Sequence, residues 1–276
     1  MSSNQKDRII MKKINKILLI LVSAVLTAAT LITMPTPIFA LNENKAYNWY
    51  VKRNTDHTLP TLPSEFSFIL ESGGIYGDRT AANTGDKVIY LTFDAGYENG
   101  NIERILDTLK KHNVPGAFFI LENLVIRNTE LVKRMASEGH LVCNHTLKHP
   151  DMTKLTEKAK FDLQLSSLSE LIKDKCGFEC AKFYRPPEGR FSEQNLKYAS
   201  ELGYKTVFWS FAYADWDNNK QPSRDDAVKK ILENVHPGEI MLLHPTSKTN
   251  ADILDEVLTA LKKDGYRFGS LTEINV

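Results

Sequence analysis

Two histidines four residues apart, His145 and His149, are the first side chains in the sequence with a chemically suggestive spacing. Imidazole pairs at such short separations often bind a metal ion. The chain has seven histidines, so the spacing alone is a weak signal. Two unrelated loop histidines are the alternative interpretation, and the position of the pair in the fold has to decide between them.

Four further positions combine a reactive group with a distinctive neighbourhood. Asp94 ends an apolar run, and Arg185 begins the stiff segment Arg-Pro-Pro-Glu-Gly. Asp215 precedes a tryptophan, and His244 follows Ile-Met-Leu-Leu. Each also has an ordinary structural interpretation, because Asp favours turns and helix N-caps, and a lone arginine or histidine is common in loops. Taken singly, none of these residues identifies a function.

The segments around these residues alternate between strand and helix patterns. Strand signals, rich in β-branched and aromatic residues, lie at 88–93, 116–121, 140–144, 182–184, 206–210, 239–243 and 266–268. Helical spacing of apolar residues occupies 102–109 and the regions near 128–138, 155–175, 192–202, 223–234 and 250–264. Seven strands separated by helices predict a parallel sheet, either open or closed into a barrel.

This layout places the candidate residues at one edge of the sheet. Ligand sites of parallel β/α folds lie beyond the carboxyl ends of the strands. Asp94, His145, Arg185, Asp215 and His244 each lie at or soon after the end of a different predicted strand. The placement favours one shared catalytic site, with a metal on the histidine pair, over scattered surface charges.

The first 40 residues have the organisation of an export signal. Lys12, Lys13 and Lys16 precede an apolar stretch over 17–32, and a small residue, Ala40, follows two prolines. A charged start, an apolar middle and a small-residue end are the parts of a secretory signal. The apolar stretch is shorter than the roughly 20 residues that a spanning helix needs. We expect cleavage near Ala40, with an uncleaved anchor as the alternative and export of the remaining chain in both cases.

Composition and charge narrow the class of protein. The 276 residues are 42% hydrophobic and 25% charged, which argues against collagen-like and mostly disordered chains. Beyond residue 40 the chain has 30 basic and 33 acidic residues, a net charge of −3, so no nucleic-acid partner is expected. A membrane is expected as a partner only through an uncleaved N-terminal segment. Residues 41–84 lack a regular pattern and are expected to form an irregular arm before a domain over 85–276.

The three cysteines do not have a metal-binding spacing. Cys176 and Cys180 flank a Gly-Phe-Glu turn and are close enough in sequence to pair, which would close a very small loop. Cys143 lies in a predicted strand and is expected to be a small buried hydrophobic residue.

Taken in order, the chemical segments resemble the polysaccharide deacetylase family, carbohydrate esterase family 4, built on the NodB homology domain. The matching segments are Thr-Phe-Asp-Ala-Gly-Tyr at 92–97, His-Thr-Leu-Lys-His-Pro at 145–150, Arg-Pro-Pro-Glu-Gly at 185–189, Asp-Trp at 215–216 and Leu-Leu-His at 242–244. Further segments, among them 48–50, 65–67, 96–100 and 208–213, resemble the delta-lactam-biosynthetic de-N-acetylases of spore-forming bacteria. The resemblance implies a distorted (β/α)7-type barrel.

The resemblance also implies a substrate, a cofactor and a location. The implied reaction is deacetylation of N-acetylmuramic acid in a peptidoglycan glycan strand, on the cell-envelope or spore-cortex side of the membrane. The free amine then closes to muramic-δ-lactam, a mark of spore cortex. The implied cofactor is a divalent metal, above all Zn2+, held by His145 and His149. Such a metal polarises the acetyl carbonyl and lowers the pKa of bound water toward ~7.

The roles of individual residues follow from the same resemblance. Asp94 is the expected general base, and His244 is the expected general acid. Arg185 is expected to keep Asp94 ionised, and Asp215 to hold His244 in its charged form. The expected substrate contacts are Trp216 and Leu242 around the acetyl group, a backbone N–H near Glu188 for the oxyanion, and Tyr97.

Two positions depart from the family pattern. Ala95 stands where the family usually has a second Asp as metal ligand, and Ala212 stands where the segment ending in Asp-Trp usually begins with Asp. Two protein ligands are fewer than the three of an ordinary catalytic zinc site. The alternatives are low metal affinity, ligation by Asp94 itself, or ligation by Glu98. The delta-lactam subfamily also departs from Asp at position 95, so Ala95 fits that assignment.

Two other functions stay open at this point. One is deacetylation of N-acetylglucosamine in a chitin-like or other acetylated polysaccharide. The other is a catalytically inactive sugar-binding domain, which Ala95 suggests.

Overall fold

The computed structural model describes residue 11 and residues 44–275. The predicted export signal therefore lies outside the described residues, and its cleavage stays a prediction. Within the described part of the chain, no helix combines the length and the apolar character needed to cross a membrane.

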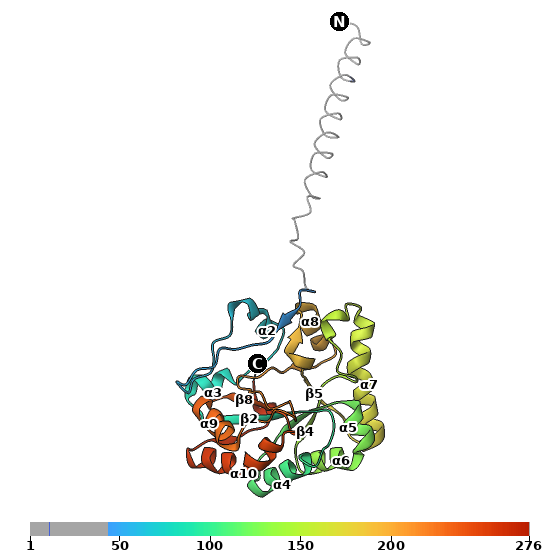
Figure 1. Ribbon diagram of the computed structural model, residues 1–276. Helices are drawn as coiled ribbons and strands as arrows, with labels where there is room; N and C mark the ends of the chain where they lie inside the picture. Colours follow the sequence, from blue (N-terminus) through green and yellow to red (C-terminus); the bar gives the residue numbers. More distant parts are fainter. Residues whose placement is uncertain (1–10, 12–43, 276) are drawn as a thin grey trace, which may run out of the picture. The chain divides into compact units, whose positions relative to one another are not determined.

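A curled sheet of seven parallel strands forms the centre of the described chain (Figure 1). Its order is β7-β5-β4-β3-β2-β8, and β9 pairs with the start of β2. The strands are β2 (Val88–Ala95), β3 (Ala117–Ile120), β4 (Leu141–Asn144), β5 (Ala181–Tyr184), β7 (Lys205–Thr206), β8 (Glu239–Leu243) and β9 (Arg267–Phe268). All seven predicted strands are confirmed, although β7 is shorter than the predicted 206–210.

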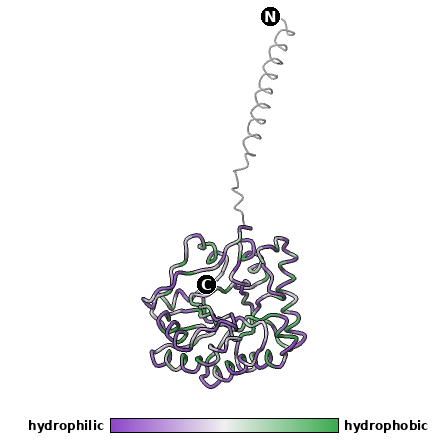
Figure 2. The backbone as a smooth tube through the Cα atoms, in the orientation of Figure 1, coloured by the Kyte–Doolittle hydropathy of each residue, from purple (hydrophilic) through white to green (hydrophobic). Residues whose placement is uncertain are grey.

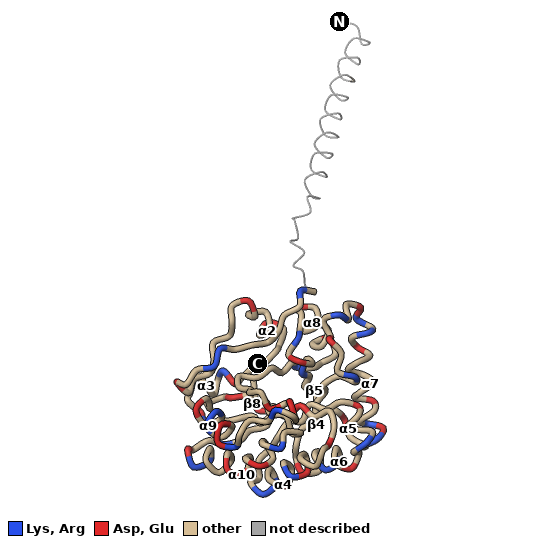
Figure 3. The backbone as a smooth tube through the Cα atoms, in the orientation of Figure 1, with Lys and Arg blue, Asp and Glu red and all other residues tan. Residues whose placement is uncertain are grey.

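Helices cover the outside of this sheet (Figure 1). They are α4 (Ile102–His112), α5 (Glu122–Arg127), α6 (Thr129–Ser137), α7 (Lys158–Cys176), α8 (Glu193–Glu201), α9 (Arg224–Asn234) and α10 (Lys248–Lys263). Apolar and polar residues alternate along them (Figure 2), and charges of both signs are spread over them (Figure 3). The six predicted helices are confirmed. Helix α5 was not predicted from the sequence, because six residues are too few to show a helical period.

The two faces of β2 have different surroundings because side chains alternate along a strand. Ile89, Leu91, Phe93 and Ala95 belong to the large hydrophobic cluster that includes the buried residues of the outer helices. Val88 and Tyr90 belong to the smaller cluster inside the curled sheet. Thr92 and Asp94 continue this inner row, so they reach the interior at the carboxyl end of the strand.

Irregular backbone closes the gap between the two edge strands, β7 and β8. Ile75 pairs with Val207, Gly77 with Glu239, and Phe211 with Met241, each as an isolated bridge. The closing segments therefore come from two places, the N-terminal arm and the residues after β7. This closure gives the distorted β/α barrel that the sequence predicts.

The arm is more regular than the sequence suggests. It contains β1 (Tyr47–Asn48), the 3-10 helix η1 (Ser64–Phe66), α2 (Phe68–Glu71) and α3 (Arg79–Thr84). Strand β1 pairs with β6 (Arg190–Phe191), which follows the 3-10 helix η3 (Pro187–Gly189). Trp49 stacks on Phe208 at a ring-centroid distance of 4.5 Å and on Phe66 at 5.7 Å. Most of the arm is irregular backbone, as expected, and the sequence did not show its four short elements because two to six residues carry no readable period.

The cysteines are free thiols in the described chain, so Cys176 and Cys180 do not form the pair that the sequence allows. Cys180 is buried, and its Sγ lies 3.6 Å from the carbonyl oxygen of Val142 instead. Cys143 is fully buried inside the sheet, as predicted.

The contact between the arm and β8 generates a stability prediction at Gly238. This glycine has φ 76° and packs on Asp78, whose N–H donates to the Gly238 carbonyl at 2.8 Å. A Cβ at position 238 would overlap the Asp78 carbonyl oxygen, whereas Gly203, with φ 78°, has open space around it. We expect Gly203→Ala to lower the free energy of unfolding by about 1 kcal/mol, from backbone strain alone. Gly238→Ala should cost about 2–4 kcal/mol, because overpacking adds to the strain.

Urea unfolding of the two variants measures both effects. Equal losses at the two positions would contradict the close approach of the arm to β8.

Candidate active site

Side chains from the ends of several strands line one cavity of about 610 Å³. Asp94 comes from β2, His145 follows β4, and His244 follows β8. The complete lining is Asp94, His145, His149, Glu188, Gly189, Trp209, Ala212, Tyr213, Trp216, Leu242 and His244. The structure thus brings together most of the residues that the sequence singled out, at the sheet edge where a ligand site is expected.

Asp94 of the cavity lining forms a buried ion pair with Arg185. Arg185 directly follows β5 and is fully buried, and its Nη1 donates to Asp94 Oδ1 at 2.7 Å. Its Nη2 donates to Thr92 Oγ1 at 2.9 Å, and its Nε donates to the Val207 carbonyl at 3.1 Å. Burial alone favours the neutral acid, but the Arg185 guanidinium outweighs it and holds the pKa of Asp94 below its ordinary value. Asp94 is therefore a carboxylate at neutral pH.

The two histidines of the pair face the same space. The Nδ1 of His145 lies 2.9 Å from the Arg185 carbonyl oxygen, which can only accept, so Nδ1 carries the proton. The other nitrogen, Nε2, lies 3.6 Å from Asp94 Oδ2. The rings of His145 and His149 have centroids 5.0 Å apart. Burial lowers the pKa of His145 to about 4, so the ring is neutral, as a metal ligand must be.

Asn144 and Thr146 shape the loop that carries the pair. Buried Asn144 accepts from the Thr146 N–H at 2.9 Å and donates to the Leu165 carbonyl at 2.8 Å. Thr146 Oγ1 then accepts from the His149 N–H at 2.9 Å. Thr146 and His149 have φ values of 75° and 57°, a conformation that needs such local support in residues other than glycine.

A second ion pair, between His244 and Asp215, belongs to the same cavity. Asp215 is fully buried, and its Oδ1 lies 2.7 Å from His244 Nδ1. Its Oδ2 accepts from the His244 N–H at 2.8 Å and from Asn250 Nδ2 at 2.6 Å. Burial alone lowers the pKa of His244, but Asp215 outweighs it and raises the pKa above its ordinary value. The pair therefore favours the protonated form of His244, and His244 lines the cavity.

The segment after β5 brings backbone to the edge of the cavity. Glu188 has φ 56°, its side chain pairs with Arg190 at 3.1 Å, and no acceptor for its N–H is found among residues 44–275. Gly189 has φ 66°, and a Cβ there would lie 2.8 Å from the Trp209 ring. Only glycine fits between this loop and Trp209. Trp216, 60% exposed, and Leu242 complete the apolar part of the wall.

Two residues that the sequence suggested for the site lie elsewhere. Tyr97 is 45% exposed and outside the cavity lining, and its hydroxyl accepts from Asn218 Nδ2 at 2.5 Å. Glu98, considered as a metal ligand, accepts from the N–H groups of Gly100 and Ile102 and so caps α4. The need to satisfy the first turn of α4 directs this carboxylate away from the cavity.

Four residues that support the site were not predicted from the sequence: Thr92, Asn144, Trp209 and Asn250. Thr92 and Trp209 lie in the family-like segments 92–97 and 208–213, so the sequence could have suggested both as site residues. Asn144 and Asn250 have no signal, because their partners, Leu165 and Asp215, are distant in sequence.

The cavity can accommodate a metal ion only with ligands besides the two imidazoles. Among the described residues, no three His, Cys, Asp or Glu side chains are grouped closely enough to hold a metal by themselves. The neutral His145 ring, with Nε2 turned toward Asp94, nevertheless fits a divalent cation. Fully buried Ala95 packs in the helix-side cluster and offers no donor atom. His145 and His149 are the residues that would hold the cation, and its remaining positions would be filled by water or substrate.

The arrangement defines a class of protein. A carboxylate held ionised and an imidazole with a raised pKa line one small cavity, which suits a reaction that removes a proton from water and gives one to a leaving group. The apolar wall beside them suits a small acyl group. The fold and the site are those of a hydrolase acting on acyl substituents.

Comparisons with known proteins specify this class. Residues 81–207 match the family model described as polysaccharide deacetylase. The peptidoglycan-N-acetylmuramic acid deacetylase PdaA of Bacillus subtilis is 42% identical over 231 residues, which cover 84% of this chain and 86% of the relative. The structure of that family 4 carbohydrate esterase has a TM-score of 0.79 at 41% identity, covering 84% of this chain and 97% of that one. A peptidoglycan-N-acetylglucosamine deacetylase of Bacillus cereus is 36% identical over 187 residues, 66% of each chain.

The chain belongs to the polysaccharide deacetylase family, the family 4 carbohydrate esterases. Deacetylases of this family are generally metal-dependent.

The Asp215–His244 pair predicts how the pKa of His244 responds to loss of the Asp215 charge. Asp215→Asn removes the charge that raises the pKa of His244, so that pKa should fall by about 1–3 units. Because His244 then loses its proton at lower pH, the alkaline limb of kcat/KM should move to lower pH by a similar amount. Titration of the His244 ring by NMR measures the shift independently of turnover.

Asp225→Asn, at an exposed aspartate in the first turn of α9, is the matched control and should leave both titrations unchanged. An unaltered His244 titration in Asp215→Asn would contradict the assigned pairing.

The histidine pair generates a prediction about metal affinity. His145→Ala removes one imidazole, and we expect Zn2+ affinity to fall by at least about 10- to 100-fold. His112→Ala, at the end of α4 beside Asp255, should leave affinity unchanged. Calorimetric titration of the metal-free protein gives both values, and equal affinities would remove His145 from the site.

Proposed function

We propose that this protein hydrolyses the acetamide of N-acetylmuramic acid residues in peptidoglycan. The observation that carries the proposal is the cavity lined by both Asp94, paired with Arg185, and His244, paired with Asp215. The named activity of the B. subtilis relative supplies the sugar, because that likeness covers most of both chains.

Each cavity residue has a task in this reaction. Asp94 accepts a proton from the attacking water, and Arg185 keeps it ionised for that purpose. His244 donates a proton to the departing amine of the sugar. The Glu188 N–H, on a residue that lines the cavity, would donate to the oxyanion that develops on the acetyl oxygen. Trp216 and Leu242 enclose the acetyl methyl group.

The proposed cofactor is Zn2+ on His145 and His149, with its other positions open to water and substrate. When bound, it would polarise the acetyl carbonyl and acidify water. The support for it is the neutral, pre-oriented His145 ring.

The biological setting extends the proposal. We propose that the chain is exported and acts on the peptidoglycan strand at the cell envelope or spore cortex, where the freed amine closes to muramic-δ-lactam. The signal-like first 40 residues and the resemblance to delta-lactam-forming enzymes support this setting. The net charge of −3 beyond residue 40 supports a partner other than nucleic acid. Tyr97, exposed beside Asn218, is proposed to contact the glycan outside the cavity.

Acetate release by the purified protein tests the proposal. We expect release from muramic-acid-containing glycan with the peptide stems removed, and much less from chitooligosaccharide. Chelator should abolish release, and added zinc should restore it. Asp94→Asn should lower kcat/KM by about 10²–10⁴-fold while the fold survives. Asp107→Asn, at an exposed aspartate on α4, is the matched control and should behave as wild type.

The alternatives give different results in the same panel. Release from chitooligosaccharide alone would replace the substrate by N-acetylglucosamine, the sugar named for the B. cereus relative. Binding of glycan without release from either substrate, even with added metal, would identify an inactive sugar-binding domain. Wild-type turnover in Asp94→Asn would refute its role as base.

A further inference from the structure

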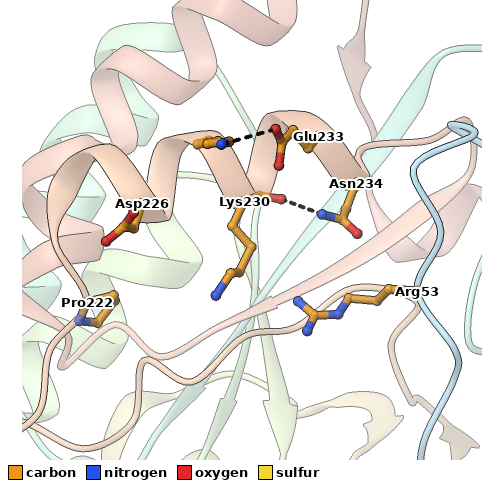
Figure 4. Close-up of a pocket in the computed structure, with 7 residues that line it drawn as sticks. Arg53, Pro222, Asp226, Lys230, Glu233 and Asn234 are labelled. Carbon is orange, nitrogen blue, oxygen red and sulfur yellow. Dashed lines mark hydrogen bonds and ion pairs between the residues drawn. The ribbon is translucent and has the colours of Figure 1, made fainter.

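A second hollow, the α9 groove, lies between α9 and the arm (Figure 4). Its volume is about 520 Å³. Its lining is Arg53, Pro222, Asp226, Lys229, Lys230, Glu233 and Asn234. None of these residues takes part in the proposed chemistry, so the groove needs a separate explanation.

The charged side chains of the groove differ in whether they have partners. Glu233 pairs with Lys229 at 3.8 Å, and Asp226 accepts from Ser223 Oγ at 2.7 Å at the start of α9. Arg53 and Lys230 have no carboxylate partner among the described residues. Figure 4 shows the ammonium group of Lys230 reaching from α9 into the groove, which the guanidinium of Arg53 enters from the arm. Two exposed cations that share a hollow repel each other, and an anion between them removes that repulsion.

Arg53 also connects the groove to the active-site cavity. Its Nη1 lies 3.5 Å from the carbonyl oxygen of Ala212, and Ala212 lines the cavity. Ala212, which contacts Arg53 and also lines the cavity, has only a methyl side chain. No carboxylate at this position competes for Arg53 or repels an acidic substrate from the cavity.

The proposed substrate carries the matching charge. Each muramic acid has a lactyl carboxylate, which is free in stem-free glycan and linked to a peptide stem with its own carboxylates otherwise. The chain beyond residue 40 carries a net charge of −3, so an acidic polymer needs local cations to bind.

Resting on the proposed function, we infer that Arg53 and Lys230 form a carboxylate-binding site for the muramyl glycan whose acetamide occupies the neighbouring cavity. The arginine fork can bind both carboxylate oxygens, and the lysine adds a point charge. The site would help to distinguish muramic acid from uncharged amino sugars.

Binding measurements in the Asp94→Asn background test this inference without turnover. The ligands are a muramyl glycan of defined length and the same glycan with its carboxylates amidated. Arg53→Gln combined with Lys230→Gln should weaken binding of the carboxylated glycan by about 3- to 10-fold, as expected for two exposed ion pairs. Binding of the amidated glycan should not change. Lys230→Arg in place of Lys230→Gln should restore part of the loss, which a purely structural effect would not.

The matched control combines Lys52→Gln with Lys263→Gln, two exposed lysines outside the groove. It removes the same total charge and should leave both affinities unchanged. A loss with stem-free glycan assigns the lactyl carboxylate, and a loss only with stem-bearing glycan assigns the stem carboxylates. Equal wild-type affinity for carboxylated and amidated glycan, or unchanged binding in the groove double variant, overturns the inference. A separate measurement tests the proposed function: if the wild-type protein releases no acetate, the proposed function is wrong.

Discussion

The burial of the Arg185 guanidinium is the constraint on which the rest of the site depends. A buried charge without partners costs several kcal/mol, so every N–H of this group needs an acceptor. Asp94 and Thr92 on β2 supply two, and the backbone after β7 supplies others through the carbonyls of Val207 and Phe208. Satisfying one side chain thus fixes the distance between β2 and the segment that closes the barrel. The carbonyl of the same residue orients the His145 ring.

The contacts that close the barrel also hold the cavity wall. Trp49 of the arm donates through its indole nitrogen to the Trp209 carbonyl at 3.0 Å and through its backbone N–H to the Gly189 carbonyl at 2.8 Å. Trp209 and Gly189 both line the cavity. The arm therefore holds the cavity wall in place, and Arg53 of the same arm brings a cation to its outside.

Two aspartates of the site are set to opposite tasks by their neighbours. Asp94, beside the Arg185 cation, keeps an ionised carboxylate at the cavity surface. Asp215 is fully buried, and its carboxylate raises the pKa of His244. Proton acceptor and proton donor can thus coexist at one pH in one small space. Ala212 places no further carboxylate in the cavity lining, which suits a substrate that carries its own.

The sequence by itself determined the order of the seven sheet strands and of six outer helices, because apolar spacing and runs of β-branched and aromatic residues are local properties of the chain. It also determined the strand-end positions of Asp94, Arg185 and His244, because parallel strands share one carboxyl edge. The tertiary structure alone decided the α9 groove and the support that Asn250 gives to Asp215, because the residues involved are far apart in the chain. It also decided that elements of the arm too short to show a period are ordered, since aromatic packing and closure of the sheet supply what local sequence lacks.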